Sequence, residues 1–292
     1  MEIKELFGIK KLFLVAGSRI DAFTDLQINW IDPRAGLGYK LSEKSTLKIA
    51  AGIFHQLPDL RLFSPEDGNP NLIPMRSEHI VVSYDLKLDK FKSLRIEAYH
   101  KNYSNLPLED DLNNYNNNGK GFANGIDFIA KGRLPIGFDG WVSYGFINTK
   151  RMWMGFDNLS KSDFDITHNL AVVLNYSLSA MWKIGINYKY ATGRPYTPVI
   201  GSNFISDRNV FEPIYGIDNS NRYPDYHRLD FRLTHLNQFF KKFSAVFYVE
   251  ALNILGITNL FGYSYNKSYS QKYKIKSYFG RRTIVFGAQV SF

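Results

Sequence analysis

Six histidines are the side chains of this sequence best suited to metal binding or proton transfer. They stand at positions 55, 79, 100, 168, 227 and 235, and no two of them are four residues apart. None forms a metal-binding pattern with a carboxylate, so structural or surface histidines are expected. The chain contains no cysteine, which excludes disulfides, thiolate nucleophiles and cysteine-bound zinc.

Motifs for a nucleophile or a phosphate are missing as well. The nearest approach to a G-x-S-x-G elbow is the sequence GYSYN at 262–266, which lacks the second glycine. Gly36 and Gly38 fall inside an expected strand rather than at the strand-to-helix turn that a phosphate loop needs. We therefore expect no catalytic residue, no metal site and no cofactor, and a protein that is not an enzyme.

Acidic side chains gather in two places, at 109–111 and at Asp157, Asp163 and Asp165. Both groups lie in or beside expected loops. They have the chemistry to bind a cation or a basic ligand, but carboxylates in loops are more often simply solvated. We expect solvated carboxylates here.

Composition narrows the class of protein. The chain has 292 residues, a hydrophobic fraction of 45% and a net charge of +9, with 19 Tyr, 23 Phe and 4 Trp. This excludes wholesale disorder. The longest apolar runs, such as 12–16 and 170–174, are far too short for a transmembrane helix. Basic residues are spread along the whole chain without a dense cluster, so no nucleic-acid partner is expected. Residues 1–17 do not resemble a signal peptide.

Alternation of apolar and polar residues is the dominant pattern of the sequence. In the last stretch Ile284, Phe286, Ala288, Val290 and Phe292 share one face, and mostly polar residues share the other. The pattern recurs in about twelve segments: 9–22, 29–41, 46–57, 77–88, 93–105, 120–133, 140–152, 164–177, 181–193, 225–238, 243–256 and 281–292. Period two predicts strands, and segments of 12 to 14 residues match tilted strands that cross a bilayer.

The connections between these segments alternate between short and long. The expected short connections are 42–45, 89–92, 134–139, 178–180 and 239–242, and the long ones are 58–76, 106–119, 153–163, 194–224 and 257–280. Outer-membrane barrels have short periplasmic turns and long extracellular loops. The sequence therefore predicts an all-β, antiparallel, up-and-down transmembrane β-barrel.

The less oily face of the expected strands carries many charges: Arg95, Glu97, Lys131, Arg133, Lys183, Lys189, Asp230, Arg232 and Glu250. Such a face suits a water-filled or plugged lumen, where opposite charges can pair, and would be costly against an apolar core. Aromatic residues near strand ends fit the girdles that anchor barrels at both interfaces: Tyr39, Trp141, Trp153, Trp182, Tyr188 and Tyr190.

Several short motifs in order resemble the barrel of one transport family. They are FHQLP at 54–58 with GNPNLIP at 68–74, NGKG at 118–121 with GID at 125–127, FDITH at 164–168, GRPYTP at 193–198, YPDYHRLD at 223–230 and VEALNI at 249–254. Each motif alone is weak, because Gly, Pro and Asn are common at strand ends. Their order and spacing across residues 30–292 resemble the C-terminal part of a TonB-dependent outer-membrane receptor barrel, most similar to the Bacteroidetes type.

The resemblance implies a location and partners. A complete receptor of this family has a signal peptide, a TonB box, a plug and a 22-stranded barrel. We expect residues 1–292 to be one domain, an incomplete part of such a barrel that lacks the upstream parts. The resemblance implies the outer membrane of a Gram-negative bacterium, contact with its lipid, and insertion by the barrel-assembly machinery with Phe292 as the signal. TonB would be reached only through a plug absent from this chain.

The expected function is uptake of a scarce nutrient, such as a siderophore, cobalamin, a glycan or a peptide. The resemblance places ligand binding in the long loops 58–76, 194–224 and 257–280. Two alternatives stay open. A self-contained twelve-stranded pore predicts pairing between the first and last strands. A soluble all-β binding domain predicts that the apolar face is buried.

Overall fold

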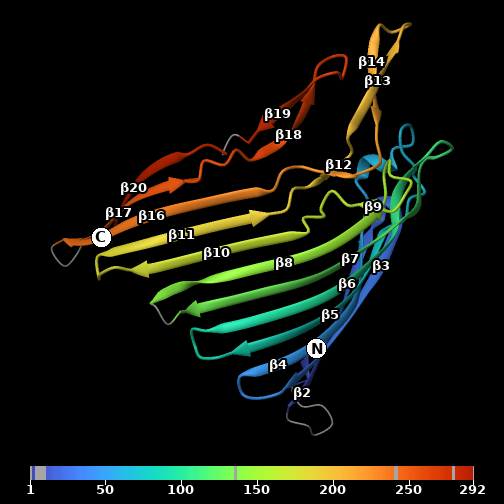
Figure 1. Ribbon diagram of the computed structural model, residues 1–292. Helices are drawn as coiled ribbons and strands as arrows, with labels where there is room; N and C mark the ends of the chain where they lie inside the picture. The colour runs from blue at the N-terminus through green and yellow to red at the C-terminus, as the bar shows by residue number, and fades with distance from the viewer. Residues whose placement is uncertain (1, 4–10, 135–136, 240–242, 278–279, 292) are drawn as a thin grey trace. The chain divides into compact units, whose positions relative to one another are not determined.

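The computed structural model describes residues 2–3, 11–134, 137–239, 243–277 and 280–291. Its principal element is a sheet with twelve long strands (Figure 1). Their bounds are β2 Leu12–Phe23, β3 Ile28–Lys40, β4 Ser45–Gln56, β5 Met75–Lys87, β6 Ser93–Asp110, β7 Asn114–Arg133, β8 Phe138–Met152, β10 His168–Ser177, β11 Trp182–Ala191, β16 Tyr226–Phe239, β17 Phe243–Leu252 and β20 Thr283–Ser291. The twelve predicted segments are confirmed, and β6 and β7 are longer than predicted.

The strands follow one another across the sheet in chain order. The order is β1-β2-β3-β4-β5-β6-β7-β8-β10-β11-β16-β17-β20, where β1 spans Glu2–Ile3, and β9 (Ser160–Lys161) pairs with β8. Neighbours are antiparallel, as in β4 with β5 and β11 with β16. This is the up-and-down topology that the sequence predicts. In this order β1 and β20 stand at the two ends.

One face of the sheet exposes large apolar side chains. The exposed fraction is 48% for Ile49, 52% for Ile80 and 75% for Phe286. A soluble sandwich would bury such a face against a second layer, whereas a barrel strand turns it toward lipid. The exposure contradicts the soluble alternative. No helix in the described residues has the length and apolar character needed to cross a bilayer.

The other face pairs its charges. Asp85 on β5 accepts hydrogen bonds from Lys48 Nζ on β4 at 2.7 Å and from Arg95 Nε on β6 at 2.5 Å. Arg133 pairs with Asp139 at 3.0 Å, and Arg228 pairs with Asp230 at 2.8 Å. The predicted pairing of opposite charges on this face is confirmed for Arg95, Arg133 and Asp230.

The aromatic residues that were predicted to form girdles divide between the two faces. Tyr39, Trp182, Tyr188 and Tyr190 alternate with the polar residues and share the apolar face. Trp141 is paired with Val173, which is paired in turn with Asn187 and then with Asp230. Because paired residues point to the same face, Trp141 lies on the charged face. The girdle interpretation is wrong for Trp141, and also for Trp153, whose position is described below.

Side-chain oxygens build three of the short turns. Ser42 Oγ accepts from the amides of Lys44 and Ser45 at 3.2 and 3.1 Å, and Ser179 Oγ accepts from Met181 and Trp182 at 3.2 and 3.1 Å. Asp89 does the same for the amides two and three residues ahead, at 2.7 and 2.8 Å. Such side chains imitate a backbone turn and let two strands reverse within a few residues.

The predicted long loop 106–119 is wrong. The strands β6 and β7 continue through it and leave a three-residue turn, 111–113. Asn-rich sequence normally disfavours strands. Here the side-chain amides of this segment bond to a neighbouring connection instead of competing with their own backbone, as the next subsection shows. The alternation of short and long connections therefore fails at this one place.

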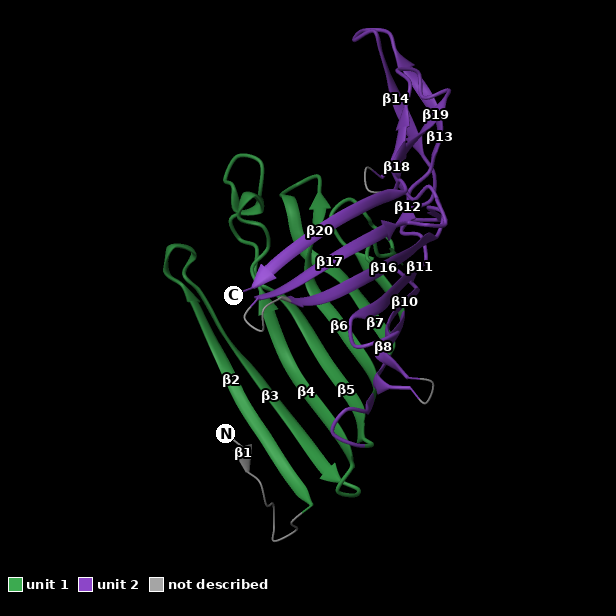
Figure 2. Cartoon of the chain, turned by 90° about the vertical axis from the view of Figure 1, so that its left-hand side faces the viewer, with its two compact units in different colours: residues 1–88, 95–127, 147–165 green, residues 89–94, 128–146, 166–292 purple. Residues whose placement is uncertain are grey.

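The remaining long connections hold short elements of their own. Residues 57–74 include the 3₁₀ helix η2 (Leu60–Phe63). The connection 192–225 includes β12 (Pro195–Tyr196), β13 (Val199–Ile205), β14 (Val210–Tyr215) and β15 (Asn221–Arg222), and 253–282 includes β18 (Leu260–Tyr265) and β19 (Lys272–Lys276). The chain divides into two compact units (Figure 2), unit 1 with residues 1–88, 95–127 and 147–165, and unit 2 with 89–94, 128–146 and 166–292.

Candidate ligand-binding surfaces in the long connections

In unit 1 the connection 57–74 folds around η2. Asp59 caps this helix by accepting from the amide of Arg61 at 3.0 Å, and it also pairs with the Arg61 guanidinium at 2.8 Å. The Arg61 side chain and then its backbone amide lower the pKa of Asp59 to about 2. Phe63 and Leu72 are buried, with 7% and 1% of their surface exposed. The predicted binding loop 58–76 therefore has a fixed conformation with a small core of its own.

Asparagine side chains fasten this connection to β6 and β7. Asn117 donates to the carbonyl of Ile73 at 3.3 Å and accepts from its amide at 3.2 Å. Asn69 Nδ2 donates to the carbonyl of Tyr115 at 2.6 Å, and Asn114 Nδ2 donates to that of Gly68 at 3.2 Å. Amides can donate and accept at once, so they satisfy loop backbone that would otherwise be unpaired. The Asn-rich run thus has a structural role.

A pocket of about 700 Å³ lies beside this clamp, and we call it the loop pocket. Its apolar wall includes Leu62, Met75, Pro107, Trp153 and Met154, and its polar lining includes Gln56, Asp59, Arg61, Asp67 and Tyr115. Met154 has a φ of +53°, which is rare for a residue with a side chain. Its amide donates to Pro107 O at 2.6 Å, and its carbonyl accepts from Glu109 N at 2.9 Å. Strain held in place beside a pocket is typical of functional sites.

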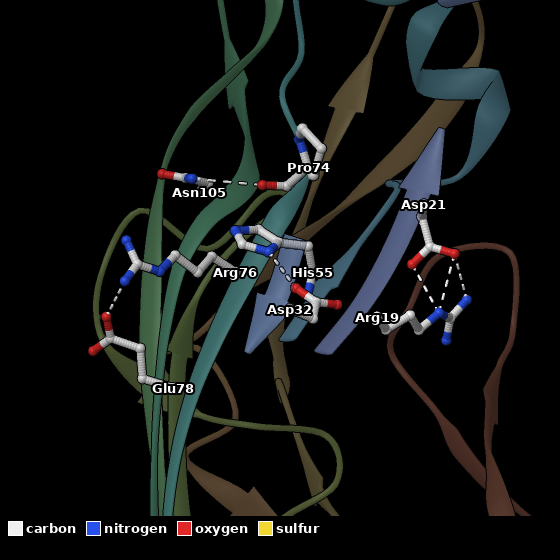
Figure 3. Close-up of polar contacts among 8 residues, drawn as sticks. All are labelled: Arg19, Asp21, Asp32, His55, Pro74, Arg76, Glu78 and Asn105. Atoms are coloured by element: carbon white, nitrogen blue, oxygen red, sulfur yellow. Dashed lines mark hydrogen bonds and ion pairs between the residues drawn. The ribbon is translucent and has the colours of Figure 1, made fainter. Parts of the chain in front are cut away.

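Polar pairs stand near the loop pocket, at the ends of the adjacent strands (Figure 3). His55 Nδ1 lies 2.7 Å from Asp32 Oδ1, and Asp32 is 5% exposed. Arg76 pairs with Glu78 at 2.5 Å, and Asn105 Nδ2 reaches Pro74 O at 3.5 Å. In the part of the chain that the structure describes, no group of three His, Cys, Asp or Glu residues is placed to hold a metal ion. These pairs order the strand ends.

In unit 2 the connection 192–225 closes on itself at its base. Asp225 accepts from Gly193 N and from Tyr190 OH, both at 2.9 Å. Arg222 donates to Gly193 O at 2.9 Å and to Thr167 Oγ1 at 2.8 Å. The Gly193 amide, together with Tyr190 OH, lowers the pKa of Asp225. A Cβ at Gly193 would overlap the carbonyl oxygen of Tyr223, so only glycine fits this base.

Three tyrosines join the two long connections of unit 2, and we call them the tyrosine cluster. The ring centres of Tyr196 and Tyr223 are 4.5 Å apart, and Tyr263 lies 5.4 and 5.2 Å from them. Lys272 Nζ lies 4.3 Å from the ring centre of Tyr263. The guanidinium of Arg194 lies 5.8 Å from the ring centre of Tyr223. Burial raises the pKa of Tyr223, so its hydroxyl stays protonated and can donate a hydrogen bond.

The structure thus brings two of the predicted loops together. Loops 194–224 and 257–280 meet at the tyrosine cluster, and Ser202 Oγ also donates to Ser268 O at 2.7 Å. Loop 58–76 contributes to the loop pocket with Pro107, Tyr115, Trp153 and Met154, which sequence reasoning did not include. No local signal in the sequence marks Met154.

The acidic groups also differ from expectation. Asp165 is not solvated, because only 2% of it is exposed, and it accepts from the amide of Thr149 at 3.1 Å. Its place is structural, since it satisfies a buried amide at the end of β8. The predicted assembly signal, Phe292, lies outside the described residues.

The sheet order, the exposed apolar face and the charged opposite face agree with a comparison of the sequence with known families. A family described as "TonB dependent receptor-like, beta-barrel" matches residues 5–282. The chain belongs to this family. Members of the TonB-dependent receptor family are transport receptors of the Gram-negative outer membrane, and this chain is an outer-membrane β-barrel protein. No curated protein matches it in sequence.

Solved structures agree in fold. The ferric-catecholate import receptor of E. coli K12 has a TM-score of 0.70 and 15% identity, and the match covers 97% of this chain and 42% of the receptor. The ferripyoverdine receptor of Pseudomonas aeruginosa, bound to ferripyoverdine, has a TM-score of 0.68 and 15% identity, with coverage of 98% and 37%. For a siderophore receptor of Acinetobacter baumannii the values are 0.67, 13%, 96% and 40%. The chain spans less than half the length of these receptors.

Proposed function

We propose that this chain forms part of an outer-membrane receptor for TonB-dependent uptake of a scarce nutrient: a siderophore, cobalamin, a glycan or a peptide. The observation that carries the proposal is the family match over residues 5–282. The solved structures support it, because receptors named for ferric-catecholate import and for ferripyoverdine share the fold. TonB would act through a plug, and the assembly machinery would insert the barrel with Phe292 as its signal.

The long connections would supply part of the ligand site. The loop pocket has a volume of about 700 Å³, which lies within the usual range for small-molecule sites. It combines an apolar wall with a few polar groups, as such sites do. We propose that the long connections face the cell exterior and that the loop pocket contacts the nutrient.

Uptake can be tested with labelled nutrients in a Gram-negative strain that lacks its own receptors. The chain would be expressed alone, and also together with a plug and the remaining strands of a related barrel. We expect uptake only from the complete assembly, and only when TonB is present. Uptake that persists without TonB would contradict the proposal and would favour the self-contained pore, which planar-bilayer conductance of the chain alone would then reveal.

A further inference from the structure

The connection 257–280 has an unusual composition. It contains four lysines, five tyrosines and no aspartate or glutamate. The connection 58–76 contains Asp59, Glu66 and Asp67. Opposite charge in two loops of one chain calls for a physical explanation, because a run of like charges repels itself unless something neutralises it.

The β19 strand arranges these charges in a row. Lys272, Lys274 and Lys276 alternate with Tyr273 and Ile275, so the three lysines share one face at a spacing of about 7 Å. All three are exposed. No carboxylate within 4.0 Å of these lysines is found in the described part of the chain. Their charge is therefore available to a partner outside the molecule.

The adjacent strand adds hydrogen-bond donors to this row. Lys274 is paired with Tyr263, and Lys272 is paired with Tyr265. In the tyrosine cluster the rings pack on one another, with centres 4.5 to 5.4 Å apart, and Lys272 and Arg194 lie near two of them. The ring faces are thus largely covered, while ammonium groups and hydroxyls remain to meet a ligand. Such a surface is suited to oxyanions.

We propose that the β18–β19 hairpin and the tyrosine cluster bind an acidic polysaccharide, a chain with repeated carboxylate or sulfate groups. A row of cations at regular spacing complements a row of anions, whereas a single small anion would occupy one lysine. Single-stranded nucleic acid binds through bases stacked on open aromatic faces, and here those faces are covered. The inference goes beyond nutrient uptake, because it holds whether the polysaccharide is a nutrient or belongs to the cell surface.

The test uses the full chain in detergent micelles, with oligogalacturonate as the acidic probe and dextran of equal length as the neutral one. The variant Lys272→Gln/Lys274→Gln/Lys276→Gln removes the row. The matched control, Lys40→Gln/Lys44→Gln/Lys90→Gln, removes the same charge from exposed lysines elsewhere. Far-ultraviolet circular dichroism checks that both variants keep their strand content.

We expect the native chain to bind oligogalacturonate and not dextran. The row variant should lose at least about tenfold in affinity, since each lysine near an anionic surface contributes appreciably. The dependence of log affinity on log salt should fall by about 2 to 3, one for each lost contact at most. The control should keep its affinity. Purified lipopolysaccharide, compared with oligogalacturonate, identifies the source by the tighter binding.

Three results would overturn the inference. In the first, oligogalacturonate binds the row variant as well as the native chain. In the second, the control loses as much affinity as the row variant, which would show a simple effect of net charge. In the third, single-stranded DNA binds through the same lysines while neither polysaccharide does.

Discussion

The two loop regions of this chain are built in different ways. In unit 1 the connection 57–74 lies against β6 and β7, and asparagine amides join its backbone to theirs. In unit 2 the connections 192–225 and 253–282 form hairpins that bond mainly to themselves and to each other. A loop that lies against strands leaves a concave space beside it. Hairpins that meet through packed tyrosines present a surface with donors.

The chemistry of the two regions differs in the same sense. The loop pocket carries Asp59 and Asp67 beside a single arginine, while the tyrosine cluster is bordered by Arg194 and Lys272. A pocket with few polar groups selects by shape, and a basic surface selects by charge. If the comparison is right, each region can be altered without a change in the other.

Glycine substitutions should have the largest effect. Gly193→Ala places a Cβ on the carbonyl of Tyr223, and Gly68→Ala places one on the carbonyl of Leu62. Each should cost about 1 to 3 kcal/mol of stability, because backbone cannot yield as a flexible side chain does. Limited proteolysis followed by mass spectrometry should show new cleavage within 194–224 for the first variant and within 58–76 for the second.

Gly201→Ala is the matched control, because its Cβ would lie 3.5 Å from Ile214 Cδ1, an ordinary contact. It should leave both cleavage patterns as they are. Cleavage in both loops of either overlapping variant would show that the two regions are not independent.

Loss of one asparagine should have the next largest effect. Asn117→Ala removes both hydrogen bonds to Ile73, and at 0.5 to 1.5 kcal/mol each the cost is about 1 to 3 kcal/mol. Hydrogen exchange at Ile73 should become faster, while exchange in 194–224 stays unchanged. Asn118→Ala is the control, because its side chain is exposed. Equal exchange in the two variants would refute the clamp.

Acid should loosen the base of the 192–225 connection in unit 2. The pKa of Asp225 lies below its usual value of 3.8, because Gly193 N and Tyr190 OH donate to the carboxylate. Its contribution is complete above the unfolded pKa and is lost as the pH falls through the lower folded pKa. We expect less than about 1 kcal/mol, because the carboxylate is largely exposed to water.

Pepsin cleavage of 194–224 should therefore increase as the pH falls below 3.8, relative to Asp225→Asn, which keeps an acceptor oxygen but does not titrate. The same acid dependence in the asparagine variant would assign the effect to another group.

The contact between Lys272 and Tyr263 should have the smallest effect. A double-mutant cycle with Lys272→Met and Tyr263→Leu should give a coupling of about 0.5 to 1 kcal/mol, as expected for an exposed cation–π pair. Tyr263→Phe retains the ring and should retain the coupling. Urea unfolding in detergent measures each stability. A coupling of zero would mean that Lys272 merely lies near the ring.

Sequence predicted the strands well because period two is a local property. Segments such as 77–88 and 181–193 show it over a dozen residues, and β5 and β11 lie where it places them. The ends of β6 and β7 were missed because Asn116 and Asn117 have poor strand propensity, and their partners lie about 44 residues away. The loop pocket was missed for the same reason: Met154 is held by Pro107.

The tyrosine cluster was predictable only in part. The run of lysines and tyrosines between 263 and 276 is visible in the sequence, and 257–280 was expected to bind ligand. The meeting of Tyr196, Tyr223 and Tyr263 depends on two hairpins folding toward each other. No local pattern encodes that contact.

The self-closing base at Gly193 and Asp225 has a consequence for how this protein can vary. Because both ends of the 192–225 connection are tied to the rim by their own hydrogen bonds, the 197–220 stretch above them is not needed to hold the strands. It can be exchanged as a cassette. Related chains can therefore diversify what they recognise by grafting new hairpins onto an unchanged socket.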